Sequence, residues 1–136
     1  MKSAFATLIV LGALPLAALR LDAHHSFNAM YDEKKTIALQ GTITKVEWMN
    51  PHARFWIDAK DADGKTTNWE VELGSPNGLI KGGYTRSVLQ TGDSITVDGW
   101  PAKDNSKIAA AGTLTLASGQ VLKSDPHWGP AEGMKK

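Results

Sequence analysis

The feature that most constrains the fold of this 136-residue chain is an alternation of apolar and polar residues that begins near residue 36. The large apolar side chains within residues 37–43 all fall on one parity, which is typical of a β-strand with one buried face. Val46 and Trp48 fall on the opposite parity, and a slip of one residue close to a glycine indicates a β-bulge. We therefore expect a long, bent first strand of the kind that a small barrel requires.

The same alternation recurs in four later segments, which are separated by residues that favour turns. Asn50-Pro51 ends the first strand, because proline cannot donate to a strand ladder and biases the residue before it toward extended geometry. Residues 61–64, Asp-Ala-Asp-Gly, are a hairpin signal, so the second and third strands are expected to pair. The later strands are expected at residues 54–59, 67–73, 95–100 and 112–116.

A short helix is expected between the third and fourth strands. Ser75 supplies an N-cap hydroxyl, Pro76 suits the first helical position, and Gly82-Gly83 ends the helix after about two turns. The sequence therefore predicts an all-β domain with one short helix, an OB-fold-like five-stranded Greek-key barrel, although periodicity alone also allows a six-stranded sandwich. The side chains expected to fill the core are Ile37, Leu39, Ile43, Val46, Phe55, Ile57, Trp69, Val71, Leu73, Leu79, Ile80, Leu89, Ile95, Val97, Leu114 and Leu116.

The N-terminal residues have the features of a signal peptide. Lys2 supplies a positive charge, residues 4–19 are almost all apolar, and Ala23 is the small residue expected before a cleavage site. Two features leave an uncleaved anchor as an alternative: Leu21 is larger than the residue usual at its position, and Arg20 places a charge just after the apolar run. The run is, however, shorter than the ~20 residues of a membrane helix. We expect cleavage after Ala23, a periplasmic or secreted mature protein and no membrane span in it. The expected organisation is a signal peptide at 1–23, an N-terminal arm at 24–35, the barrel domain at 36–123 and a loose C-terminal tail at 124–136.

The charge balance of the mature chain argues against a nucleic-acid partner. Lys2, Arg20 and Asp22 leave with the signal peptide, so 13 basic and 13 acidic side chains remain. A neutral chain has no long-range attraction for phosphate backbones. The chain contains no cysteine, which excludes a lipid-anchored lipoprotein and any disulfide. No nucleophile triad, phosphate loop or dinucleotide motif is visible, so we expect a binding protein for a small ligand or an envelope protein, not an enzyme.

The histidines are the residues best suited to chemistry. His24 and His25 would begin the mature chain, His52 lies in the turn after the first strand, and His127 lies in the tail. An N-terminal histidine can chelate through its α-amine and imidazole together, which suits Cu(II), Ni(II) and Zn(II). We therefore expect a copper or zinc site with His24, His25 and His52 as ligands, to which Met49 and His127 could add. The alternative is that the first two are a solvated terminus and that His52 bonds within its own turn.

A second hypothesis places a ligand on the surface of the barrel. Trp56 lies opposite the apolar face of its strand with Arg54 nearby, and exposed aromatic rings on OB barrels are stacking platforms for bases or sugars. The simpler interpretation is that most of the five tryptophans fill the barrel and its ends, and Trp69 in particular is expected in the core.

A third hypothesis is a hydrolase that uses a pair of carboxylates as acid and base. Alternate polar positions on an antiparallel strand face solvent by default, so the pattern alone favours ordinary surface residues. The carboxylates that share polar strand faces are Glu47, Asp58, Glu70 and Glu72.

Several motifs together resemble one known family. Ala23-His24-His25-Ser26-Phe27, the segment from Glu47 to His52 and Gly74-Ser75-Pro76-Asn77 occur in this order. They resemble DUF6152, a family of small exported proteobacterial proteins of unknown function. The resemblance implies an exported single-domain β-protein with no established activity. It also implies that the histidine elements and the helix start are shared features, which favours a common site.

Overall fold

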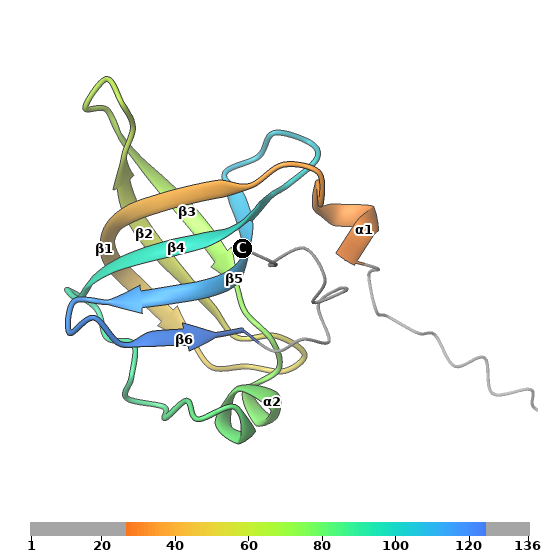
Figure 1. The fold of residues 1–136 in the computed structure, drawn as a ribbon, viewed down its shortest axis with the longest axis vertical. Helices are drawn as coiled ribbons and strands as arrows, with labels where there is room; N and C mark the ends of the chain where they lie inside the picture. Colours follow the sequence, from red (N-terminus) through yellow and green to blue (C-terminus); the bar gives the residue numbers. More distant parts are fainter. Residues whose placement is uncertain (1–26, 125–136) are drawn as a thin grey trace, which may run out of the picture.

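Five strands of the computed structural model close into a barrel, and the structure describes residues 27–124 (Figure 1). A sixth, short strand pairs with the last barrel strand. The elements in chain order are α1 (Phe27–Met30), β1 (Ile37–Glu47), β2 (Arg54–Lys60), β3 (Thr66–Glu72), α2 (Pro76–Lys81), β4 (Ser94–Pro101), β5 (Ile108–Leu116) and β6 (Val121–Lys123).

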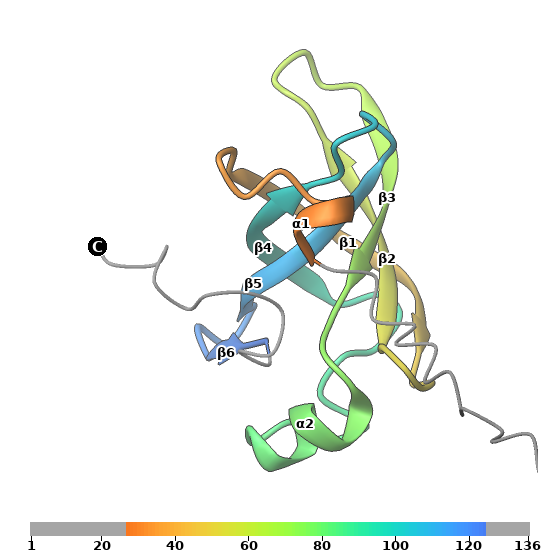
Figure 2. The ribbon, with the colours of Figure 1, turned by 90° about the vertical axis from the view of Figure 1, so that its right-hand side faces the viewer.

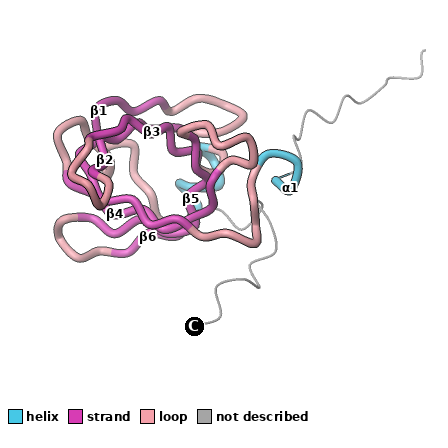
Figure 3. The backbone as a smooth tube through the Cα atoms, turned by 90° about the horizontal axis from the view of Figure 1, so that it is seen from above, coloured by secondary structure: helices cyan, strands magenta, loops and turns pink. Residues whose placement is uncertain are grey.

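The strand order confirms the predicted fold. β1 is central and pairs antiparallel with both β2 and β4. The sheet closes where Glu70–Glu72 of β3 pair parallel with Ile108–Ala110 of β5. Figure 3 shows the strands as a ring, with α1 outside it beside β5. This order, with a helix between β3 and β4, is that of an OB-fold barrel, which excludes the six-stranded sandwich.

The long first strand contains the predicted bulge. Its pairing with β2 shifts register between Ile43 and Lys45. Two residues before the bulge, Gly41 pairs with Ala59 on one side and with Ile95 on the other. A Cβ at Gly41 would lie 2.2 Å from the carbonyl oxygen of Asp58, so only glycine lets the neighbouring backbone approach this closely.

The predicted caps define α2. The Ser75 hydroxyl accepts a hydrogen bond from the Gly78 N–H at 3.2 Å, and the Gly82 N–H donates to the Gly78 carbonyl at 2.9 Å. The helix lies at one end of the barrel (Figure 2), where Leu79 is buried in the core. Ile80 was predicted in the core as well, but it is 45% exposed. Neighbouring residues of a helix point about 100° apart, so a helix this short turns only one of the two inward.

The core otherwise follows the predicted alternation. Phe55, Ile57, Val71 and Val97 are fully buried. Four further residues predicted in the core are only partly buried against it, namely Ile37, Val46, Trp69 and Leu116. The Lys107 ammonium lies 5.0 Å from the centroid of the Trp69 ring.

β5 begins four residues earlier than the sequence predicted. The added residues include Ala109–Ala111, all of which are buried. A run of small apolar residues shows no alternation, so periodicity could not identify it as a strand. Its partner β4 carries a register shift between Asp98 and Gly99, and the pairing continues to Pro101.

The described part of the arm, residues 27–35, packs against the end of β4. It contains the short helix α1, which the sequence did not predict. The Asp32 N–H donates to the Pro101 carbonyl and the Lys103 N–H donates to the Met30 carbonyl, both at 2.9 Å. The Phe27 ring meets the Trp100 ring edge-on, with centroids 5.3 Å apart. Within residues 27–124, neither helix is long and apolar enough to cross a membrane.

The close approach at Gly99 gives a test of the barrel geometry. A Cβ at this position would lie 1.9 Å from the Ala110 carbonyl oxygen, so Gly99→Ala must push β4 and β5 apart. We expect a loss of about 3 kcal/mol in the free energy of unfolding, measured by urea denaturation. Gly82→Ala is the control, since its Cβ would meet the Leu79 carbonyl at 3.3 Å, and a similar loss there would contradict the explanation.

Candidate functional site

Among the described residues, one charged side chain is buried, that of Glu72, with 4% of its surface exposed. Its neighbour Val71 points into the core, so Glu72 lies on the outer face of β3. Its cross-strand neighbours are Arg54 on β2 and Ala110 on β5, and Ala110 pairs in turn with Trp100 on β4. The expectation that Glu72 faces solvent is therefore wrong, because the arm covers this part of the outer face.

Tyr31 of the arm binds one oxygen of this carboxylate. Its hydroxyl donates to Glu72 Oε2 at 2.6 Å, and the tyrosine is 1% exposed. Burial, and then the hydrogen bond to Glu72, raise the pKa of Tyr31 far above its ordinary value. The hydroxyl therefore remains protonated and acts as a donor.

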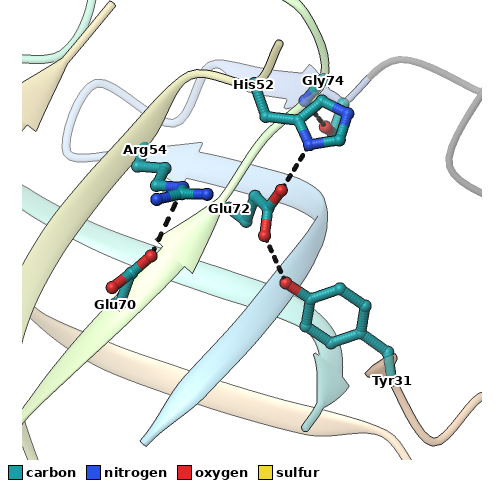
Figure 4. A network of polar contacts seen from close by, with 7 residues as sticks. Tyr31, His52, Arg54, Glu70, Glu72 and Gly74 are labelled. Carbon is teal, nitrogen blue, oxygen red and sulfur yellow. Dashed lines mark hydrogen bonds and ion pairs between the residues drawn. The ribbon is translucent and has the colours of Figure 1, made fainter. Parts of the chain in front are cut away.

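His52 binds the other oxygen of the same carboxylate, as Figure 4 shows. The contact joins His52 Nδ1 to Glu72 Oε1, and the imidazole remains 27% exposed. The β1–β2 loop, residues 48–53, is fastened next to it, because the Ala53 N–H donates to the Gly74 carbonyl at 3.0 Å. A carboxylate favours the tautomer that carries its proton on Nδ1, which leaves the lone pair on Nε2.

The predicted ligand face at Arg54 and Trp56 is made of paired side chains. Arg54 Nε lies 3.4 Å from Glu70 Oε1, and the Lys45 ammonium lies 4.4 Å from the centroid of the Trp56 ring. Both Arg54 and Trp56 are half-buried. A lysine over the ring covers one face that a stacked base or sugar would need.

The four carboxylates proposed for hydrolysis have separate partners. Glu72 binds Tyr31 and His52, while Glu70 pairs with Arg54. The remaining two are also engaged: Glu47 pairs with Lys45 at 2.5 Å, and Asp58 accepts a hydrogen bond from Asn68 at 2.8 Å. Each of the four carboxylates thus has a polar partner of its own, and the absence of an enzymatic activity stays a prediction.

Of the histidines predicted to bind a metal, the structure describes only His52. His24, His25 and His127 lie outside residues 27–124, and Met49 is exposed in the β1–β2 loop. Within the described part of the chain, no three histidine or carboxylate side chains are grouped so that they could hold a metal ion. A metal on His52 would therefore need ligands from elsewhere.

Sequence reasoning missed the roles of Tyr31 and Glu72. The alternation of β3 shows that Glu72 points away from the core, but not that the arm covers it. The available signal was the pair of aromatic residues in the arm, Phe27 and Tyr31, because aromatic side chains seek a surface on which to pack.

Comparison with known proteins identifies the family. The family model described as "Family of unknown function (DUF6152)" matches residues 13–111. The chain belongs to DUF6152. A comparison of this DUF6152 protein with curated proteins found no match.

Among solved structures, the protein is similar to Rim1, a mitochondrial single-stranded DNA binding protein from S. cerevisiae. The two are 13% identical with a TM-score of 0.45, over 66% of this chain and 95% of that chain. So distant a likeness says nothing about what this DUF6152 protein binds. The exclusion of nucleic acid rests on charge and stays a prediction.

Removal of one hydroxyl tests the contribution of the Tyr31 bond to stability. Tyr31→Phe keeps the ring but takes away a donor to a buried carboxylate, so we expect the free energy of unfolding to fall by about 2 kcal/mol. Tyr84→Phe is the matched control, because Tyr84 is 2% exposed and its hydroxyl has no hydrogen-bond partner among the described residues. Equal effects in urea denaturation would refute a specific role for the Tyr31 bond.

Alkaline titration tests the burial of both tyrosines. Desolvation raises the pKa of Tyr84, as it does for Tyr31, and the chain has only these two tyrosines. Both pKa values in the folded state lie above the unfolded value of about 10. The contribution of the protonated tyrosines to the free energy of unfolding is therefore fully present below pH 10. Stability should then fall by up to about 1.4 kcal/mol per pH unit for each tyrosine as the pH rises further. The ultraviolet absorbance of tyrosinate should appear only with unfolding, and a midpoint near pH 10 in the folded protein would contradict this.

Proposed function

We propose that this DUF6152 protein is an exported binding protein that holds a copper or zinc ion at His52. The imidazole and α-amine of His24 and the imidazole of His25, at the start of the processed chain, are the further ligands. The observation that carries the proposal is the bond from His52 Nδ1 to the buried carboxylate of Glu72.

This bond is the arrangement that orients histidine ligands in metal sites. A histidine that coordinates a metal through one nitrogen usually donates the other N–H to a carboxylate, which fixes the ring and strengthens it as a ligand. Glu72 fulfils this role from a buried position, and Tyr31 holds its second oxygen. The partial exposure of His52 leaves the imidazole within reach of an ion from solution.

The docking of the arm supports the choice of the remaining ligands. Tyr31 and His52 bind the two oxygens of one carboxylate, so the arm is fastened next to His52. Phe27 follows His25 by only two residues, and an extended chain spans about 3.5 Å per residue. The proposal requires these few residues to run from Phe27 toward His52.

Imidazole and amine nitrogens favour copper and zinc over magnesium or calcium, which prefer oxygen ligands. Cleavage after Ala23 would create the amine, so the proposal ties the site to export. The rival function, a ligand face at Arg54 and Trp56, would leave metal affinity independent of the histidines.

A titration with Cu(II) and Zn(II) tests the proposal. The protein should be produced with His24 as its first residue, beside a variant with one added residue before His24. Because the addition moves the amine away from its imidazole, we expect Cu(II) affinity to fall by about tenfold or more, as measured by calorimetry.

Variants of the described residues complete this titration. His52→Ala should weaken both metals, and Glu72→Gln should weaken them by about 10- to 100-fold through the loss of the orienting carboxylate. Trp56→Ala is the control and should have no effect. If the added residue changes nothing, the terminal amine is not a ligand; if no form binds either metal, the proposed function is wrong.

A further inference from the structure

Two segments that are distant in sequence are joined by one carboxylate. Glu72 Oε2 accepts from Tyr31 of the arm, and Glu72 Oε1 meets Nδ1 of His52 in the β1–β2 loop. Figure 4 shows the three side chains in a row, with Glu72 in the middle. Neither outer residue can change its bond without affecting the carboxylate that holds the other.

We infer that the docking of the arm and the occupation of His52 are coupled through Glu72, so that a ligand on His52 Nε2 tightens the docking of residues 27–35. The identity of this ligand as copper or zinc rests on the proposed function. The coupling itself is a property of Tyr31, Glu72 and His52.

The direction of the coupling follows from the chemistry of the two bonds. A cation on Nε2 withdraws electrons from the ring, which makes the Nδ1–H a stronger donor to Glu72. The stronger bond restricts the rotamers of the carboxylate, so Oε2 stays in position to accept from Tyr31. Coupling between two sites is reciprocal, so a docked arm must favour ligand binding by the same factor, typically about 5- to 150-fold.

The remaining contacts of the arm make this coupling measurable. Phe27 packs on Trp100, and the Lys103 ammonium donates to the Asn28 carbonyl, so the arm keeps anchors that do not involve Glu72. Tyr31→Phe should therefore weaken docking without abolishing it. The intact arm also provides two reporters, the Asp32 N–H bonded to Pro101 and the Lys103 N–H bonded to Met30.

The first experiment needs no metal and uses the chain that begins at His24. In wild-type protein, the imidazole ¹⁵N shifts should show His52 as a single tautomer with its proton on Nδ1. Tyr31→Phe should shift them toward a mixture of tautomers, which a purely structural role of the tyrosine would not do. In the reverse direction, His52→Ala should speed hydrogen exchange at Asp32 and Lys103 by about tenfold.

The matched control is Tyr84→Phe, which removes an equally buried hydroxyl that has no hydrogen-bond partner among the described residues. It should alter neither the His52 shifts nor the exchange of the two amides. If Tyr31→Phe leaves the His52 shifts unchanged and His52→Ala leaves the exchange unchanged, the coupling is refuted, whatever the metal result.

The second experiment adds saturating Zn(II). Exchange at Asp32 and Lys103 should slow by about tenfold in wild-type protein, and clearly less in Tyr31→Phe with zinc still bound. Zinc that binds at His52 without slowing either amide overturns the coupling and leaves the proposed function standing. If zinc does not bind, the proposed function fails, and the metal-free measurements alone decide the coupling.

Discussion

The docking of the arm and the position of the β1–β2 loop on this barrel depend on the two hydrogen bonds of the Glu72 carboxylate. A buried charge is costly unless its oxygens are hydrogen-bonded, and here a tyrosine and a histidine satisfy one oxygen each. This requirement draws the arm and the β1–β2 loop to the same point of the sheet. The arm covers Glu72, and Glu72 in turn gives the arm a polar anchor that apolar packing alone would not provide.

The fold could be predicted because its determinants are local. Alternation located the strands, the change of parity after Ile43 located the bulge, and Ser75-Pro76 with Gly82-Gly83 bounded the helix. The early start of β5 could not be predicted in this way, since the small residues of that segment are buried on both faces and produce no periodic signal. Ile80 was misplaced because a two-turn helix gives too few positions to define its inner face.

The candidate site was only partly predictable. The type and position of His52 suggested a ligand, but its orientation depends on Glu72, which the sequence pattern assigned to solvent. Burial of an outward-facing residue is decided by what covers the sheet, and that is a long-range property. Tyr31 lies 41 residues before Glu72, so no local pattern connects them.

The closure of the barrel bears on when the site can form. β3 and β5 meet over three residue pairs, and the partners Glu72 and Ala110 are 38 positions apart in the chain. Contacts of such long range must overcome a large loop-closure entropy, so this seam is expected to form late in folding. Glu72 belongs to this pairing of β3 with β5, and Tyr31 of the arm binds Glu72 there. A chain threaded through a membrane in the unfolded state would therefore assemble the His52 site only after it emerged and its barrel closed.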